Sequence, residues 1–248
     1  MSPARTILIT GANRGIGFSI LQALATRSPS DCYLLGCRKA EDGEAAISQF
    51  RNLGITAEIH VVVLDVSNES SIKAAEQIIR TTYQNLDVMI NNAGIALLEA
   101  PDHSNIPEIY AATFQTNVTG VALMMSTFLP LLKATSTDPR IINVSSARGS
   151  LYLASSGKLP PSTTRSYCVS KAALNMLTVE YARAEPEVKI CAAEPGSCKT
   201  AFNGFRGQKD PLDGAKVVVE LALADKRKYV GGFWGMNTED KEAQEVPW

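Results

Sequence analysis

The sequence predicts a single-domain α/β fold in which helices flank both faces of a doubly wound parallel sheet of about seven strands. Two observations lead to this prediction. Short apolar runs alternate with segments of helical periodicity, and strands that alternate with helices form parallel crossover units. In addition, the run Val61–Leu64 is apolar at every position, as expected of a strand that helices cover on both faces.

The expected strands are short and rich in aliphatic residues. They are Arg5–Thr10, Tyr33–Gly36, Glu58–Asp65, Leu86–Ile90, Arg140–Val144, Lys189–Ala193 and Tyr229–Trp234. The expected helices carry apolar residues at spacings of three and four. They are Phe18–Thr26, Ala45–Leu53, Ser70–Tyr83, Ile109–Leu132, Arg165–Ala184 and Asp213–Leu223. Three loops, Glu99–Pro107, Ser150–Thr164 and Phe202–Pro211, follow strand ends, where an open sheet of this kind binds its ligand.

Composition narrows the class of protein. Charged residues make up 20% of the 248 residues, and 24 Lys and Arg against 25 Asp and Glu give a net charge of −1. Without a bulk positive charge, neither nucleic acid nor an anionic membrane is expected as a partner. The longest apolar stretch, Val121–Leu132, is shorter than the roughly 20 residues that cross a bilayer. Because no targeting segment is visible, we expect a cytoplasmic protein.

The cysteines and histidines give no pattern of a disulfide frame or a metal site. The five cysteines are odd in number and have no CxxC spacing, which is typical of reduced thiols. The two histidines, His60 and His103, lie far apart in the sequence. We therefore expect no bound metal.

A glycine-rich segment follows the first expected strand and opens the first expected helix. It runs Thr10-Gly11-Ala12-Asn13-Arg14-Gly15-Ile16-Gly17. Gly11 allows a tight turn, Gly15 lets the backbone approach a pyrophosphate, and Gly17 lets the helix pack close to the sheet. The helix N-terminus then offers free N–H groups to the phosphates. The segment predicts a dinucleotide site, with a ligand-free turn as the alternative.

The end of the second strand indicates which dinucleotide binds. An NAD site usually places a carboxylate about 20 residues after the glycines, to accept hydrogen bonds from the ribose. Here Cys37 is followed by Arg38 and Lys39, and Arg14 lies in the glycine turn. Arginine binds phosphate in bidentate fashion, so we expect NADP(H), with its 2′-phosphate, in preference to NAD(H). Solvated surface charges are the alternative.

A tyrosine and a lysine are spaced to share one helix face. Tyr167 and Lys171 are four positions apart in an expected helix. An ammonium near a phenol lowers the phenol pKa and suits it to acid–base catalysis. Ser145 and Ser146 follow the strand Arg140–Val144, where a hydroxyl donates to a substrate carbonyl or merely caps a turn.

With these motifs in place, the sequence resembles the short-chain dehydrogenase/reductase family over essentially its whole length. The matching segments occur in the family's order: Thr10–Gly17, Asp65-Val66, Asn91–Gly94, Asn117, Ser146, Tyr167 with Lys171, and Pro195-Gly196 with Thr200. The segment TGANRGIG, the pair Cys37-Arg38 and the final Trp248 are similar to carbonyl-reductase-like members. The resemblance implies a Rossmann-type sheet, with a cofactor half near residues 1–140 and a catalytic half near 141–248.

The resemblance also implies roles for the catalytic residues. Tyr167 would be the acid/base, and Lys171 would lower its pKa and hold the nicotinamide ribose. Ser146, which fits the family's SxxG register with Gly149, would polarise the carbonyl, and Ser145 is the fallback. Asn117 would kink its helix and hold a relay water, a role compatible with a buried amide that bonds to the backbone.

The remaining implied roles concern the cofactor. Asp65 would accept from the adenine amino group beside Val66, although it is also placed to cap the strand end. The other implied contacts are Asn91, Ala93 and Gly94 at the adenosine ribose, and Pro195, Gly196 and Thr200 at the nicotinamide carboxamide.

Together these residues predict an NADPH-dependent reductase that transfers hydride to the ketone or aldehyde carbonyl of a small molecule, reversibly with alcohol oxidation. Two alternatives stay open: other chemistry on the same scaffold, such as imine reduction or cyclisation in secondary metabolism, and a nucleotide-binding regulatory protein.

Ser146 and Tyr167 are 21 positions apart, more than is usual in the family. Candidate apolar substrate contacts are Tyr152, Leu153, Phe202 and Phe205. A homo-oligomer, dimer or tetramer, and a monomer are all compatible with the sequence.

Overall fold

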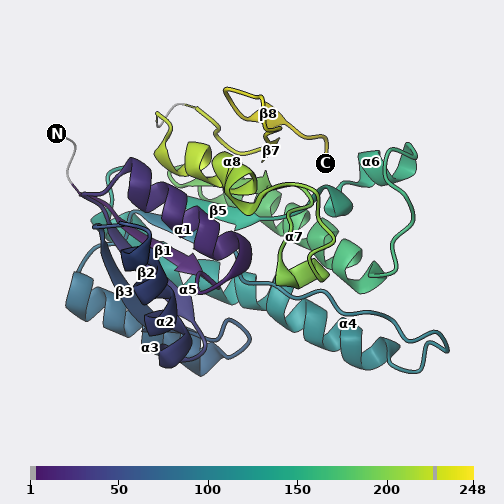
Figure 1. Cartoon of the computed structure of the whole chain (residues 1–248), viewed down its shortest axis with the longest axis horizontal. Helices are drawn as coiled ribbons and strands as arrows, with labels where there is room; N and C mark the ends of the chain where they lie inside the picture. Colours follow the sequence, from purple (N-terminus) through teal and green to yellow (C-terminus); the bar gives the residue numbers. More distant parts are fainter. Residues whose placement is uncertain (1–3, 226–227) are drawn as a thin grey trace.

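One eight-stranded sheet organises the protein (Figure 1), in the order β3-β2-β1-β4-β5-β6-β7-β8. The structure is a computed structural model that describes residues 4–225 and 228–248. The strands are β1 (Thr6–Thr10), β2 (Cys32–Cys37), β3 (Glu58–Val63), β4 (Val88–Asn91), β5 (Arg140–Val144), β6 (Lys189–Glu194), β7 (Phe233–Gly235) and β8 (Gln244–Glu245). Each neighbouring pair is parallel except β7 and β8.

Helices connect the strands and cover both faces of the sheet. The α-helices are α1 (Gly15–Arg27), α2 (Ala40–Asn52), α3 (Glu69–Ile78), α4 (Ile106–Phe114), α5 (Gly120–Thr135), α6 (Leu151–Ser155), α7 (Arg165–Ala184) and α8 (Pro211–Leu223). Short π-helical turns follow α3 (η1, Ile79–Tyr83) and join α4 to α5 (η2, Gln115–Thr119), and 3-10 turns form η3 (Ala147–Gly149) and η4 (Ala201–Asn203). The predicted doubly wound α/β fold is confirmed.

Alternation along the strands explains why both faces are covered. Ile7 and Ile9 of β1 belong to the core cluster under α1, α2 and α8, whereas Leu8 between them belongs to the cluster under α3, α5 and α7. All three side chains are fully buried. Helices α1 and α8 lie side by side on their face (Figure 1). A strand that is apolar at successive positions is stable only between two such layers.

The largest differences from the predicted elements, at α2, α6 and β7, have local reasons. Helix α2 begins at Ala40 rather than at Ala45, because Glu41 and Asp42 favour a first helical turn. Helix α6 lies within a segment expected to be a loop, and the Ser150 hydroxyl caps it. Strand β7 begins only at Phe233, since Tyr229, Gly231 and Gly232 have positive φ angles that do not fit a strand. The two-residue strand β8 is too short to leave a sequence signal.

Helices α4 and α5 with η2 form one continuous helical run. It covers the 30 residues Ile106–Thr135, which by length and composition alone could cross a membrane, because an 18-residue window within them has a mean hydropathy of 1.4. In this fold, Met124, Phe128 and Leu132 of that run are fully buried in the core beside the sheet. These three apolar side chains therefore pack in the core of the protein, as in a buried helix of a globular domain.

Candidate active site

The glycine turn between β1 and α1 has the backbone form of a phosphate cradle. Gly11 and Gly15 have φ angles of +65° and +60°, which glycine adopts without strain. A Cβ on Gly17 would lie 2.3 Å from the Gly11 carbonyl oxygen, so only glycine lets α1 start this close to the turn. Asn13 and Ile16, which complete the turn, are half-buried.

The amino terminus of α1 is open to an anion. Arg14, at its cap position, makes no side-chain cap hydrogen bond, and the first turn of this helix carries no acidic residue. The side chains of Asn68 and Asp210, by contrast, cap α3 and α8. Free N–H groups and the positive end of the helix dipole bind phosphate well. The turn therefore fits the pyrophosphate of a dinucleotide.

Asn92, which sequence reasoning passed over, holds the glycine turn in place. Its side-chain amide donates to the carbonyl oxygens of Thr10 and Gly11, at 2.8 and 3.3 Å. The Thr10 hydroxyl accepts from the N–H groups of Asn92 and Ala93, each at 3.0 Å. These bonds fasten the ends of β1 and β4 together. An amide side chain directly after a buried strand was the available signal.

Three exposed cationic side chains stand at the edge where β1 and β2 end. Arg38 and Lys39 directly follow β2, and Arg14 lies in the glycine turn. The Ala12 N–H donates to the Gly36 carbonyl at 3.2 Å, so the turn and the end of β2 are adjacent. A phosphate bound at this edge would meet positive charge on more than one side.

The side chains of Asp65 and Asn91, two of the expected adenosine contacts, form hydrogen bonds to other residues of the protein. Asp65 Oδ1 accepts from the Ser67 N–H at 2.9 Å and from its hydroxyl at 2.6 Å, which is the strand-end cap that the sequence left as the alternative. Asn91 is 3% exposed, and its amide donates to Asn143 at 2.8 Å. Val66 is also buried. Spacing alone did not reveal the Asn143 partner of Asn91, because it comes from another strand, whereas the Ser67 partner of Asp65 is only two residues away.

Tyr167, Lys171 and Ser146 converge from two elements. Tyr167 and Lys171 lie one turn apart on α7, and Ser146 follows the end of β5. The Lys171 Nζ lies 5.6 Å from the centre of the Tyr167 ring. The Ser146 side chain lies near enough to Tyr167 to lower the pKa of its phenol. A substrate oxygen beside these two hydroxyls would meet two hydrogen-bond donors.

The two serines after β5 have different surroundings. Ser145 is 3% exposed, and its hydroxyl donates to Asn175 Oδ1 at 2.5 Å. Ser146 is half-buried, and its hydroxyl accepts from the Arg148 N–H at 3.2 Å and also reaches Tyr167. The arrangement favours Ser146 over Ser145 as the hydroxyl that acts with Tyr167.

Burial controls the pKa of Tyr167 and the pKa of Lys171. It raises the pKa of Tyr167 above its ordinary value, an effect that the Ser146 side chain only partly offsets. It lowers the pKa of Lys171 to about 8. The prediction that Lys171 depresses the Tyr167 pKa is therefore not met in this structure: the Lys171 Nζ donates to the Val144 carbonyl at 2.7 Å, and loss of hydration dominates. The phenol is protonated at neutral pH, the form that donates a proton.

Glu194 is an acid at this site that sequence reasoning missed. It is the last residue of β6, and its Oε1 accepts from the Ala147 N–H at 3.4 Å. Burial raises the pKa of Glu194, and the charge of Glu194 further raises the pKa of Tyr167. A carboxylate at the end of an otherwise apolar strand was the signal for it.

Asn117 lies in the π-helical turn η2, which interrupts the long helix. Its amide oxygen accepts from the Ile95 N–H at 2.9 Å, and its amide nitrogen donates to the Ile95 carbonyl at 2.8 Å and to Ser170 at 3.0 Å. A Cβ on Gly94 would lie 3.2 Å from this amide oxygen and 3.8 Å from the Lys171 Nζ. Asn117 thus ties the segment after β4 to α7, and such turns are frequent at functional sites.

The segment after β6 closes over the glycine turn. Pro195 is buried, Gly196 has a φ angle of +85°, and Thr200 is 7% exposed. A Cβ on Gly15 would lie 3.8 Å from the Thr200 Cβ. Thr200 and Gly15, far apart in the sequence, are therefore close neighbours in the fold.

Of the expected substrate contacts, Phe202 packs against Tyr167. Its ring packs edge-on against the Tyr167 ring, with centroids 5.6 Å apart. Phe205 is 60% exposed. The Tyr152 N–H donates to the Trp248 carbonyl at 3.0 Å, and the Leu153 N–H donates to the Ser150 hydroxyl at 3.0 Å. Phe202 is thus placed to border a substrate at Tyr167.

Comparison with known proteins identifies the family. The family model described as short chain dehydrogenase matches residues 5–211. The short-chain dehydrogenase anuI of Penicillium roqueforti is 36% identical over 237 residues, which cover 91% of each chain. Carbonyl reductase (NADPH) 1 of Sus scrofa is 30% identical, with 90% of this chain and 88% of that protein covered. The NADPH-bound carbonyl reductase from chicken fatty liver has a similar structure, with a TM-score of 0.83, 27% identity and 99% of both chains covered. This chain belongs to the short-chain dehydrogenase family.

Proposed function

We propose that this protein is an NADPH-dependent reductase of ketone or aldehyde carbonyl groups in small molecules. The observation that carries the proposal is the meeting of Ser146, Tyr167 and Lys171 at the carboxyl edge of the sheet, the same edge at which the uncapped helix α1 begins. The pig and chicken relatives, whose names specify NADPH and carbonyl reduction, support it. A binding protein would have no need of all three groups in one place.

The cofactor preference rests on the charge at the edge of β1 and β2. The pyrophosphate would lie at the free N–H groups of α1, and the 2′-phosphate would lie near Arg38, Lys39 and Arg14. Cys37, where an NAD site usually has a carboxylate, is buried, and its thiol donates to the Lys39 carbonyl. This combination favours NADP(H) over NAD(H).

The catalytic groups would act on the substrate oxygen. Bound NADPH supplies the hydride that reduces the carbonyl carbon. Ser146 and Tyr167 hydrogen-bond to the oxygen and stabilise the negative charge that grows there. Tyr167, whose phenol is protonated at neutral pH, then donates its proton to that oxygen. The Lys171 ammonium, held by the Val144 carbonyl, adds positive charge beside the phenol.

A screen of carbonyl compounds would test the proposed function directly. The purified protein is incubated with NADPH and panels of ketones and aldehydes, and NADPH consumption is followed by absorbance. Turnover of at least one compound, with the matching alcohol as product, is the expected result. Tight NADPH binding without turnover of any carbonyl compound would instead favour the regulatory alternative.

Replacing Arg38 by alanine should weaken NADPH binding selectively. Loss of a charge-assisted pair with phosphate costs about 1.5–3 kcal/mol, so KM for NADPH should rise roughly 10- to 100-fold. KM for NADH, which lacks the phosphate, serves as the internal control and should stay within about twofold. Equal increases for both cofactors would mean that Arg38 does not bind the phosphate.

Ser145 and Ser146 should give opposite phenotypes when each is replaced by alanine. Ser146→Ala removes a donor to the substrate oxygen, so kcat should fall about 10²- to 10³-fold with little change in Tm. Ser145→Ala leaves the buried Asn175 Oδ1 without its donor and should lower the free energy of unfolding by about 1–3 kcal/mol. Steady-state kinetics and thermal denaturation separate the two. Full activity in Ser146→Ala would contradict the assignment.

A further inference from the structure

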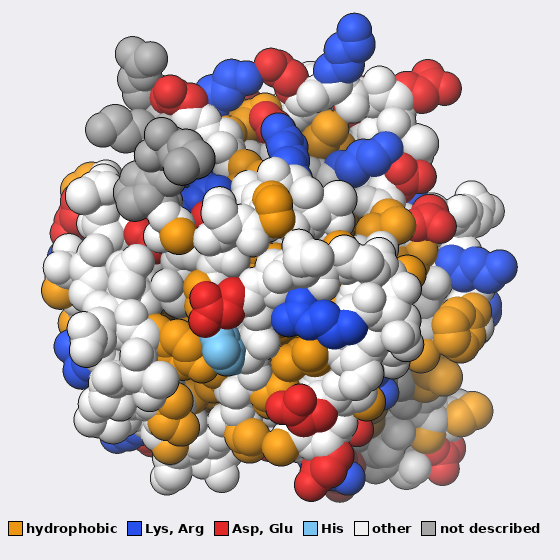
Figure 2. Space-filling view, turned by 60° about the vertical axis from the view of Figure 1, so that its left-hand side comes forward, with side chains coloured by type: hydrophobic (Ala, Val, Ile, Leu, Met, Phe, Trp, Pro, Cys, Tyr) orange, Lys and Arg blue, Asp and Glu red, His pale blue; other side chains and the backbone are white. Residues whose placement is uncertain are grey.

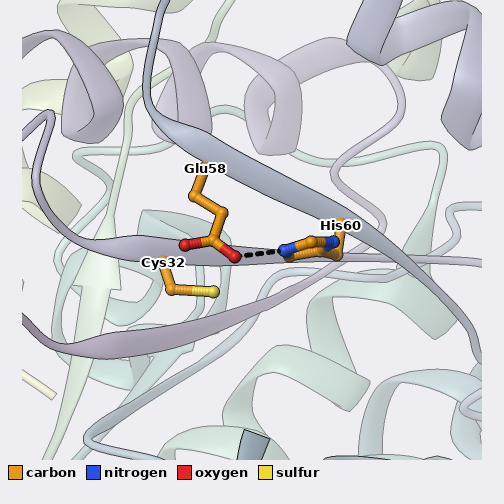
Figure 3. A group of neighbouring side chains, drawn as sticks. All are labelled: Cys32, Glu58 and His60. Carbon is orange, nitrogen blue, oxygen red and sulfur yellow. Dashed lines mark hydrogen bonds and ion pairs between the residues drawn. The ribbon is translucent and has the colours of Figure 1, made fainter. Parts of the chain in front are cut away.

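A group of three potential metal ligands lies at the start of β2 and β3, at the opposite end of these strands from the cofactor edge. They are Cys32, Glu58 and His60 (Figure 3). Cys32 pairs with Glu58 in the parallel register, and His60 follows two residues along β3, so the three side chains lie on one face of the sheet. Figure 2 brings this side of the molecule forward and shows a histidine beside an acidic side chain at the surface.

We propose that Cys32, Glu58 and His60 form a binding site for a thiophilic divalent cation, with zinc as its natural occupant. The three ligand atoms lie within 4.8 Å of one another. One thiolate, one imidazole and one carboxylate are a ligand set that zinc accepts, with water as the fourth ligand. The thiolate makes magnesium and calcium, which prefer oxygen ligands, poor occupants.

His60 and Glu58 need only a small movement to admit the ion. The His60 Nε2 and Glu58 Oε1 atoms are 2.6 Å apart and hydrogen-bonded. Tetrahedral zinc, with bonds of about 2 Å to both atoms, requires them roughly 3.3 Å apart. The Glu58 side chain is 66% exposed and free to rotate by that amount. The metal would thus replace a hydrogen bond that already holds two ligands together.

Both the charge of the ligands and the packing around them favour a bound cation. On binding, the Cys32 thiol loses its proton to solvent, and the thiolate and the Glu58 carboxylate together neutralise the two charges of zinc. The nearby Asp31 is paired with Arg5 at 2.7 Å and does not compete. The Tyr83 ring lies against His60, with centroids 5.3 Å apart, and limits how the imidazole turns. Two adjacent, hydrogen-bonded strands hold the ligand backbones in place.

The position of the site indicates a structural or regulatory role. Cys32 and Cys37 are the first and last residues of β2, and five residue steps of about 3.3 Å separate the site from the cofactor edge by roughly 16 Å. Strand β3 is the outermost strand at this side of the sheet. A metal that joins β2 to β3 would therefore secure the sheet edge without touching the reacting atoms. This inference does not depend on the proposed function.

Metal titration of the purified, reduced protein tests the site without any substrate. Zinc should bind with a stoichiometry of one per chain in calorimetry and raise Tm, whereas magnesium should do neither. Cobalt, used in place of zinc, should produce a near-ultraviolet thiolate-to-cobalt charge-transfer band. That band reports on Cys32 ligation and is not expected from a cation held only by surface carboxylates.

Variants assign the binding to these three residues. His60→Gln changes a side chain that is 40% exposed and should not disturb folding. It should weaken zinc binding by at least the roughly 10- to 100-fold that loss of an outer-shell partner costs. Cys32→Ala should abolish the cobalt band. The matched controls are His103→Gln, at the other histidine, and Cys168→Ser, at the other half-exposed thiol; both should bind zinc like the wild type.

The outcomes are decisive in both directions. Loss of binding in His60→Gln and Cys32→Ala, but not in the two controls, supports the site. Absence of one-to-one zinc binding in the wild type overturns it, as does unchanged affinity in His60→Gln. Because cofactor binding and turnover are not part of the measurement, a failure here leaves the proposed reductase activity untouched.

Discussion

Tyr167→Phe should reduce NADPH-dependent turnover at least about 10³-fold, because it removes both the proton donor and one hydrogen bond to the developing oxyanion. The ring itself, which packs against Phe202, is retained, so the pocket keeps its shape. Cofactor binding should survive, since the glycine turn is unchanged. NADPH at about 100 times its Kd should still stabilise the variant by roughly 2.7 kcal/mol in thermal denaturation.

A second tyrosine on the same helix provides the matched control. The Tyr181 hydroxyl donates to the Ala122 carbonyl at 3.5 Å, and 14 positions along α7 separate it from Tyr167 by about 21 Å. Tyr181→Phe removes the same group and should keep activity within about twofold of the wild type. Similar losses in both variants would point to a general effect on α7 rather than to catalysis by Tyr167.

Lys171→Met should abolish activity and yet stabilise the fold at neutral pH. Lys171 is 5% exposed, and burial lowers its pKa from 10.5 to about 8. At about 1.4 kcal/mol for each factor of ten, the buried ammonium costs the folded state roughly 3 kcal/mol. Methionine removes this cost but leaves the Val144 carbonyl without its donor. The unsatisfied carbonyl destabilises the folded state by about 1–3 kcal/mol. The net expectation is a gain of about 1 kcal/mol at pH 7.

The stability difference between Lys171→Met and the wild type should depend on pH. Between pH 8 and 10.5 the unfolded state holds a proton on Lys171 that the folded state has lost, so wild-type stability gains from that group as pH rises. The advantage of Lys171→Met should therefore be largest below pH 8 and shrink towards pH 10.5. Denaturation of both proteins across this range measures it, with Lys216→Met, an exposed lysine paired with Asp213, as the control. A difference that does not vary with pH would mean that Lys171 has an ordinary pKa.

The pKa shifts of Tyr167 and Lys171 could not be predicted from residue spacing alone. A spacing of four residues correctly indicated that Tyr167 and Lys171 share a helix face. The spacing gave no information on how much hydration each group loses on folding. Nor did it reveal that the Val144 carbonyl accepts a hydrogen bond from the Lys171 Nζ. The net direction of the Tyr167 pKa depends on those quantities. Likewise, spacing could not distinguish Ser145 from Ser146, whereas the Asn175 partner of Ser145 does.

The sequence by itself determined the fold class, the order of the parallel strands along the chain and the glycine turn. These follow from periodicity and from glycine's backbone freedom, both of which are local properties. Only the tertiary structure decided which side chains meet across the sheet: Asn92 with the glycine turn, Asn91 with Asn143, and Cys32 with Glu58 and His60. These contacts depend on strand register and on burial, which arise only when segments distant in the chain pack together.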